Sequence, residues 1–211
     1  MKRIFTFFSL FLAMLSFGQE EKIDIPIMEA ALKNPQSPYY MEKLMYNYKG
    51  LPMSMGNDAA SYLYYGSAQL NPSKVDIFGS EFIQSMEFFR QKKYEDCIAS
   101  TLKLYAKDPL NMDVLILLFQ SYNELGNQEQ AAHYFSQLRL VIETIKRSGD
   151  GKSEATAFVV NSIRDEYIFL DAMGIKLKEF QRNAKILDDG MMDIWSKGSL
   201  SIYVKVLSSE K

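Results

Sequence analysis

The feature that most constrains the fold is a helical pattern that repeats after about 34 residues in the middle of the chain. Residues 78–107 contain two amphipathic helical segments separated by Lys92-Lys93-Tyr94. Residues 111–146 contain two more, separated by Gly126-Asn127, and Pro109 ends the first unit. Amphipathic helices joined by short loops predict antiparallel helix pairs that bury their apolar sides against each other.

The residues of both units occupy positions typical of a tetratricopeptide (TPR) repeat. Cys97 and Ala131 are small residues where two helices would cross closely, and Gly126 permits a tight turn. The other matching residues are Tyr94, Asp96, Ile98, Leu104, Asp108 and Pro109 in the first unit and Leu118, Tyr122 and Phe135 in the second. A generic helical bundle with accidental spacing is the alternative. Because about three repeats usually make a stable solenoid, the flanking regions are expected to cap the array.

The segment before the repeats alternates short helical patterns with breaks. Pro26 can open a helix over 27–32, and Pro38 can open a second one. Asn57 or Asp58 is expected to cap a third helix that ends at Gly66. These helices are the expected N-terminal cap of the array.

The last third of the chain changes character after Ser148-Gly149-Asp150-Gly151. Apolar, β-branched and aromatic residues predict strands over 156–161, 175–180, 191–195 and 200–206, and Lys197-Gly198 predicts a hairpin turn. Ser162 with Asp165 predicts the start of a helix. The expected fold is mainly α with a C-terminal α+β part: TPR-like antiparallel helix hairpins, then a small, mainly antiparallel β-sheet.

The first nineteen residues have the pattern of a secretory signal peptide. Lys2 and Arg3 precede an apolar run of about 14 residues, too short to span a bilayer, and Ser16 and Gly18 suit signal peptidase. An uncleaved anchor is the alternative, and the lack of a cysteine argues against a lipoprotein. The predicted organisation is a signal peptide (1–19), a TPR-like helical region with capping helices (20–147) and an α+β cap (148–211). The mature chain is expected to be periplasmic or extracellular, with no membrane span.

Composition excludes several classes of function. The net charge of −2 gives no electrostatic basis for binding nucleic acid. One cysteine and one histidine exclude an intramolecular disulfide and a Cys/His zinc cluster. Gly149–Ser153 looks like part of a phosphate-binding loop, but Lys146 stands where that loop needs a glycine, so a turn is expected. His133 is expected on a helix surface and Cys97 in a helix contact. The sequence assigns no catalytic residue, metal or cofactor.

Two candidate sites remain, and the sequence favours a binding role over an enzyme. A TPR-like array would bind a protein or peptide partner on its concave face, here through Phe82, Met86, Phe89, Ile116, Gln120 and Asn123. The same stripe could instead be covered by the N-terminal helices. The alternative function is a hydrolase-type or other small-molecule enzyme whose site lies where helices and sheet meet, near Asp150, Lys152, Asp165 and Glu166.

Several segments resemble the domain of unknown function 4919 family of exported bacterial proteins. They are Leu63-Tyr64-Tyr65-Gly66, the repeat-like helix pairs, the glycine-rich turn 148–153 with Thr156-Ala157, and Asp165-Glu166-Tyr167. The likeness extends from about Pro38 to Val206. It implies a secreted, TPR-like protein with no assigned activity, so no catalytic residue is carried over. The turn and its following strand would hold either a site or the joint between helices and sheet.

Overall fold

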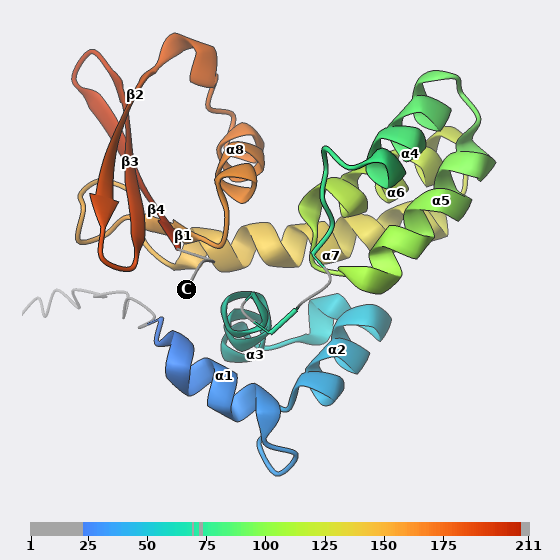
Figure 1. Cartoon of the computed structure of the whole chain (residues 1–211), viewed down its shortest axis with the longest axis horizontal. Helices are drawn as coiled ribbons and strands as arrows, with labels where there is room; N and C mark the ends of the chain where they lie inside the picture. Colours follow the sequence, from blue (N-terminus) through green and yellow to red (C-terminus); the bar gives the residue numbers. More distant parts are fainter. Residues whose placement is uncertain (1–22, 69, 72–73, 208–211) are drawn as a thin grey trace, which may run out of the picture.

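The computed structural model describes residues 23–68, 70–71 and 74–207. The chain is mostly helical and ends in a four-stranded mixed sheet (Figure 1). The predicted signal peptide, residues 1–19, lies outside the described residues.

The described N-terminal region forms helices α1 (Ile25–Lys33), α2 (Met41–Gly50) and α3 (Asn57–Ser61), with a 3-10 turn η1 (Pro52–Ser54) and a π-helical turn η2 (Tyr62–Gly66). The predicted start near Pro26 is confirmed, and the Asp24 side chain caps α1 by accepting from the amide of Ile27. The predicted cap at Asn57 or Asp58 is wrong. Gly56 is the cap residue and makes no side-chain hydrogen bond.

The middle of the chain forms α4 (Ser80–Arg90), α5 (Tyr94–Lys107), α6 (Met112–Glu124) and α7 (Gln128–Arg147), and each helix packs on the next. Lys92 and Gly126 both have positive φ, 59° and 73°. The next residue in each turn donates its amide hydrogen back to the helix before it: Lys93 to the oxygen of Phe88, Asn127 to that of Tyr122. The turns at Lys92 and Gly126 therefore have the same geometry.

The small residues of these units lie where helices meet. Cys97 and Ala131 are buried, and the Ser121 hydroxyl on α6 donates to the Cys97 sulfur on α5 at 3.3 Å. The expected burial of both residues is confirmed. A larger side chain at either position would push neighbouring helices apart.

The C-terminal region contains β1 (Phe158–Val160), α8 (Ile163–Ala172), β2 (Gln181–Leu187), β3 (Gly190–Lys197) and β4 (Leu200–Leu207). The strand order is β1-β4-β3-β2, with β1 parallel to β4 and the other two pairs antiparallel. The sheet is therefore mixed, and because two of its three strand pairs are antiparallel, the expectation of a mainly antiparallel sheet is confirmed. The parallel pair arises because β1 joins the sheet from α7, far from its partner in sequence.

The strand expected over 175–180 is wrong. Gly174 ends α8 with a φ of 76°, and a 3-10 turn η3 (Leu177–Glu179) follows before β2 begins at Gln181. Ile175, Leu177 and Phe180 pack against the core from this turn. Their spacing mimics the alternation of a strand because a short turn also brings every second or third side chain inward.

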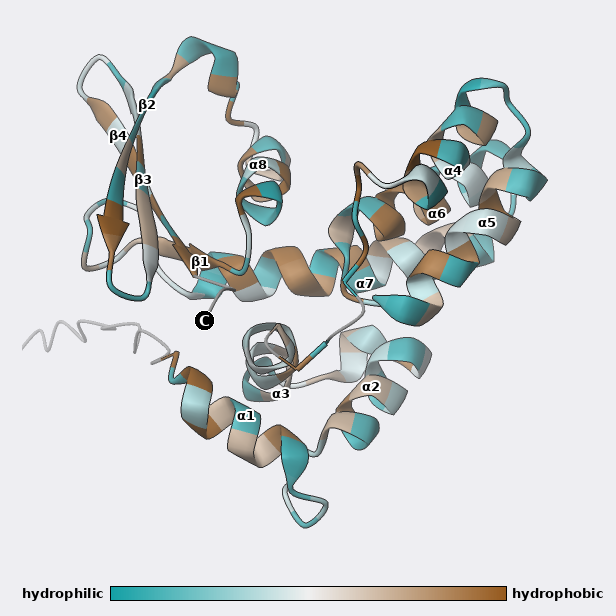
Figure 2. Ribbon diagram, in the orientation of Figure 1, coloured by the Kyte–Doolittle hydropathy of each residue, from teal (hydrophilic) through white to brown (hydrophobic). Residues whose placement is uncertain are grey.

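Helix α7 connects the two halves of the molecule. It packs on α6 at one end and on β1 and α8 at the other (Figure 1). Figure 2 shows hydrophobic residues along α7 and β1, where these elements meet. One cluster of buried residues runs from Phe82 and Leu118 through Ile145 to Phe169 and Trp195, so helices and sheet share a core.

Candidate functional site

The glycine-rich turn after α7 is folded tightly on itself. A Cβ atom at Gly149 would overlap the backbone oxygens of Thr156 and Ala157. The Asp150 carboxylate accepts hydrogen bonds from the Thr156 hydroxyl at 2.6 Å and the Lys152 ammonium at 2.9 Å. These hydrogen bonds, that of Lys152 foremost, hold the pKa of Asp150 well below its usual value. Both carboxylate oxygens of Asp150 thus have a partner within the turn.

The same turn fastens α7 to the sheet. The Ser148 hydroxyl accepts from the amide of Val159 at 2.8 Å, and the Gly151 carbonyl accepts from the amide of Tyr203 at 2.9 Å. These bonds reach β1 and β4. The turn acts as the joint between helices and sheet, one of the two roles that the sequence left open.

Asp165 lies on the first turn of α8 and faces the N-terminal helices. The Tyr64 hydroxyl donates to its carboxylate at 2.8 Å. The pKa of Asp165 is raised to about 6, chiefly by burial; hydrogen bonds from Tyr64 and Ser162 oppose this rise, and the nearby Asp108 and Asp113 add to it. Asp165 therefore anchors α8 to η2.

Glu166, the next residue, faces the sheet instead. It is fully buried, and the Trp195 indole donates to its Oε1 at 2.6 Å. Burial, and secondarily the neighbouring Asp193, raise the pKa of Glu166 to about 8. Asp150 and Lys152 bond each other on an exposed turn, whereas Asp165 and Glu166 are held by different elements. The structure does not bring the four junction residues to one point.

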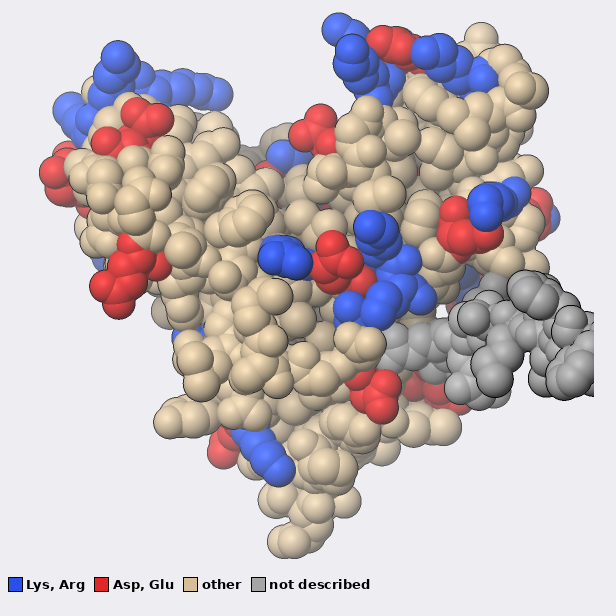
Figure 3. Space-filling model, turned by 180° about the vertical axis from the view of Figure 1, so that it is seen from behind, with Lys and Arg blue, Asp and Glu red and all other residues tan. Residues whose placement is uncertain are grey.

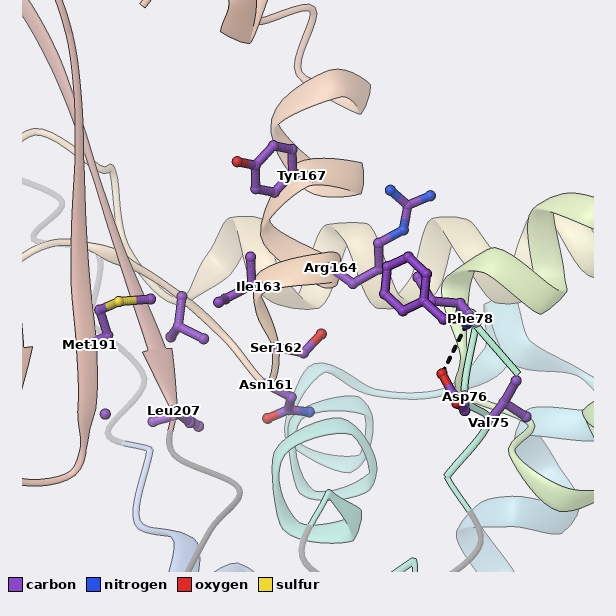
Figure 4. Close-up of a pocket in the computed structure, with 13 residues that line it drawn as sticks. Val75, Asp76, Phe78, Asn161, Ser162, Ile163, Arg164, Tyr167, Met191 and Leu207 are labelled. Carbon is purple, nitrogen blue, oxygen red and sulfur yellow. Dashed lines mark hydrogen bonds between the residues drawn. The ribbon is translucent and has the colours of Figure 1, made fainter. Parts of the chain in front are cut away.

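A cleft that we call the junction cleft opens beside them, between α8, the segment before α4 and the ends of β3 and β4 (Figure 4). Its volume is about 870 Å³, within the range of ordinary ligand sites. Its lining residues are Val75, Asp76, Ile77, Phe78, Asn161, Ser162, Ile163, Arg164, Tyr167, Gly190, Met191, Val206 and Leu207.

Large apolar side chains are exposed in the junction cleft. Phe78 is 83% exposed, and Ile163 and Tyr167 on α8 are also exposed. Figure 4 shows Phe78 beside Arg164, while Met191 and Leu207 form the sheet side. Contiguous exposed apolar groups on a folded protein commonly mark a binding surface.

Most polar groups of the junction cleft already have partners. Asp76 accepts from the amide of Phe78, and the Ser162 hydroxyl caps α8 by accepting from the amide of Asp165. Arg164 binds Asp113 through Nε, at 2.8 Å from Oδ2, and through a terminal nitrogen. Asn161 differs from these residues, because its buried Oδ1 has no hydrogen-bond partner among the described residues and points toward the Leu207 side in Figure 4.

A second, more polar pocket of about 520 Å³ adjoins the junction cleft. The two share Val75, Ile77, Asn161, Ser162 and Arg164. Its other walls carry charges of both signs, including Lys49, Lys74, Lys107, Asp108 and Asp113. Figure 3, the view from behind, likewise shows basic and acidic residues side by side near the centre of that face. Mixed charges of this kind do not select a polyanion or a polycation.

The six residues predicted on the helical face have different environments. Phe82 belongs to the buried core, and Met86, Phe89 and Ile116 are half-buried against that core. Gln120 and Asn123 are exposed. None of the six lines the junction cleft or the polar pocket.

The sequence pattern does not single out Phe78, Arg164 or Asp193 as site residues. The sequence pattern predicts a helix that starts at Phe78, but α4 begins at Ser80. Asp76, two residues before, accepts from the Phe78 amide in a turn closed by Gly79. An Asp three residues before a Gly is a turn signal that could have placed Phe78 in a loop. No local pattern indicates the partners of Arg164 and Asp193.

The described residues hold neither a metal-binding cluster nor a membrane-spanning helix. Residues 23–207, apart from the three undescribed positions among them, contain no group of three His, Cys, Asp or Glu side chains able to hold a metal ion. Within the same ranges, every helix is too short or too polar to cross a membrane.

Comparison with known proteins gives one match. A family model described as "Domain of unknown function (DUF4919)" matches residues 26–189. No curated protein and no solved structure matches the chain. The matched range contains Tyr64, Tyr65, the glycine-rich turn and α8. In the structure Tyr64 bonds Asp165, and the Tyr65 hydroxyl donates to the carbonyl of Val159, so these distant segments meet at the joint.

Proposed function

The chain belongs to the DUF4919 family, whose description names no activity, and from the geometry of the junction cleft we propose that it is a protein-binding module. The occupant of the cleft is an extended peptide segment with large apolar side chains, contributed by another protein. The observation that carries this proposal is that the side chains of the cleft that are free to contact a ligand are mainly apolar. One buried acceptor in the cleft, Asn161 Oδ1, has no hydrogen-bond partner among the described residues.

The available contacts suit a peptide better than a sugar or a nucleotide. Such polar ligands need several free donors and acceptors, whereas Asp76, Ser162 and Arg164 are already bonded within the protein. A peptide offers apolar side chains for Phe78 and Ile163. One backbone N–H of the same peptide can donate to Asn161 Oδ1, which satisfies a buried acceptor.

A peptide selection followed by affinity measurements tests this function. Random linear peptides are displayed on phage and selected on the chain, and the best binders are measured by fluorescence anisotropy. Phe78→Ser should weaken their binding at least about tenfold, because an exposed aromatic anchor is lost. Tyr46→Ser is the matched control, since Tyr46 on α2 is 81% exposed and lies outside the cleft. Peptides that bind Phe78→Ser as tightly as the wild type would overturn the proposal.

We also propose that α4–α7 are two TPR-like repeats that present the cleft. The equal turns after α4 and α6 and the buried Cys97 and Ala131 support this interpretation. The helical face with Gln120 and Asn123 remains a predicted second surface for contact with the protein partner. Replacing both residues by Ala should then lower the affinity for a selected protein partner without changing the affinity for the cleft peptide.

Acid–base catalysis is a second candidate, favoured by one observation. Asp165 lines the polar pocket and has a pKa raised to about 6, as a general acid or base would. Screening ester, glycoside and amide substrates against wild type and Asp165→Asn would decide. Turnover that disappears in the variant, while its circular dichroism is unchanged, would favour an enzyme.

We also propose that the chain is exported from the cytoplasm. Lys2, Arg3 and the apolar run that follows support secretion, so the proposed partner is a protein of the periplasm or the exterior. Cell fractionation and N-terminal sequencing of the recovered chain test this. A chain in the cytoplasm that retains Met1 would contradict it.

A further inference from the structure

Two carboxylates are buried together between α8 and the sheet. Glu166 and Asp193 each have 0% of their surface exposed. The Trp195 indole donates to Oε1 of Glu166 at 2.6 Å, and Arg182 donates to Oδ2 of Asp193 at 2.6 Å. The second oxygen of each carboxylate, Oε2 of Glu166 and Oδ1 of Asp193, has no partner among the described residues.

The charges of this cluster do not balance if both acids are ionised. Asp193 is within hydrogen-bonding range of Glu166 and repels its charged form, whereas the Arg182 cation attracts both carboxylates. Two negative charges with one positive charge leave a net charge buried without compensation, which is very unfavourable. One proton placed between the two free oxygens removes this charge and satisfies both atoms.

Among the described residues, the strands and the helix packed around the pair contribute uncharged side chains. The β4 residues opposite Trp195 and Asp193 are Ile202 and Val204, and β1 contributes Phe158. The buried residues on the last turns of α7 are Val141, Thr144 and Ile145. On α8 itself, Tyr167 is the titratable side chain that faces Arg182. The proton balance therefore depends on Glu166, Asp193 and Arg182.

We propose that Glu166 and Asp193 share a single proton, and that release of this proton under mildly alkaline conditions loosens α8 from the sheet. With the proton in place, the cluster is neutral and ties α8 to β3 and β2. Without it, the two carboxylates repel each other across the α8–sheet contact, and water must enter to solvate them.

Loosening of α8 also changes the junction cleft. The Tyr167 ring packs edge-on against Trp195, with 5.6 Å between ring centroids, and Tyr167 lines the cleft. A shift of α8 moves this wall, so binding in the cleft becomes pH-dependent. This consequence, unlike the shared proton, rests on the proposed function.

Trp195 makes the shared proton directly measurable, because it is the only tryptophan of the chain. Its fluorescence is recorded between pH 6.5 and 9.3, below the usual ionisation of tyrosine near pH 10. A single transition is expected near pH 8, since the pKa of Glu166 is raised to about 8. A wild-type signal that is flat across this range overturns the proposal.

Two variants test whether the fluorescence transition comes from Glu166 and Asp193. Glu166→Gln keeps the shape and the acceptor for Trp195 but cannot ionise, so its fluorescence should be flat. Asp193→Asn removes the repelling charge and should move the transition to lower pH by at least about one unit. Glu179→Gln is the matched control, because Glu179 is an exposed acid paired with Lys197, and it should behave as wild type. A transition that persists unchanged in Glu166→Gln contradicts the inference.

The effect on the cleft is measured with a phage-selected peptide at pH 7 and pH 9. Its affinity should fall at least about threefold at pH 9 in the wild type and stay constant in Glu166→Gln. Equal affinity at both pH values, with the fluorescence transition present, disproves the link between α8 and the cleft. Absence of binding at both pH values instead refutes the proposed function and leaves the fluorescence result to decide the shared proton.

Discussion

The four helices α4–α7 and the sheet region with α8 are stabilised in different ways. Each helix of the first region packs mainly on its neighbour in sequence, through apolar and small residues such as Leu118 and Ala131. The sheet region depends on partners far apart in sequence, such as β1 with β4 and Glu166 with Asp193. Contacts in the helical region are thus mostly between sequence neighbours, whereas the sheet region depends on contacts between distant segments.

The largest expected effect tests that dependence at the joint. Gly149→Ala places a Cβ atom against the backbone of Thr156 and Ala157, which flexible side chains cannot relieve. We expect a loss of about 3 kcal/mol or more in the free energy of unfolding, measured with urea. Gly50→Ala, where nothing lies within 4 Å of the new atom, is the control and should stay within about 0.5 kcal/mol. Similar losses for both would show that the joint is not rigid.

The next effect concerns pH and the buried pair. Glu166 keeps its proton in the folded state up to about pH 8, whereas the unfolded chain releases it near its ordinary pKa of 4.5. Folding therefore takes up a proton in this window, and stability should fall as pH rises, by up to about 1.4 kcal/mol per unit. Asp165, with its pKa raised to about 6, acts in the same direction at the acidic end.

Glu166→Gln should flatten this decline, most clearly between pH 6.5 and 8, when urea unfolding is repeated at each pH. The helical region offers the contrast, because Glu81→Gln alters an exposed acid paired with Lys107 and should preserve the slope. A slope that is unchanged in Glu166→Gln would mean that another group takes up the proton.

A smaller effect is expected where the two regions touch. Arg164 on α8 forms a two-point ion pair with Asp113, which is nearly buried on α6. Arg164→Ala leaves the Asp113 charge without its partner and should destabilise the chain by about 1–3 kcal/mol. Lys33→Ala removes one member of an exposed pair with Glu29 and should cost less than about 0.5 kcal/mol. Equal losses would show that the contact does not couple the regions.

The smallest expected effects test whether the helical turns at Lys92 and Gly126 are equivalent. Gly126→Ala puts a side chain in a left-handed conformation but meets no atom within 4 Å, so a loss of about 1 kcal/mol is expected. Lys92→Gly relieves the same conformation in the first turn and should raise stability by about 0.5 kcal/mol, since glycine also loosens the unfolded chain. Effects of the same sign would mean that the turns are not equivalent.

The elements predicted from the sequence are mostly those with a local pattern. The breaks at Lys92 and Gly126, the capping of α8 by Ser162 and the turn at Lys197-Gly198 are all present. The false strand over 175–180 shows where local patterns fail, because a turn and a strand can bury the same residues. The parallel pairing of β1 with β4 has no local signal, since it depends on how α7 delivers the chain to the sheet.

The candidate sites, too, could be predicted from the sequence only where a local pattern marks them. The sequence pattern marks Asp165 and Glu166 as adjacent acids, and both have a raised pKa. Their roles could not be read from spacing, because Tyr64 and Trp195, which bind them, are distant in sequence. The exposed position of Phe78 was hidden because aromatic residues near a helix start usually pack inward.

The sequence by itself determined the helices, their turns and the small contact residues, because helical periodicity, glycine and residue size act over a few neighbours. The tertiary structure alone decided that the glycine-rich turn is a joint, that a cleft lies beside α8 and that two acids are buried face to face. Each of these depends on the burial of charged or apolar groups against distant segments, and burial is a property of the assembled chain.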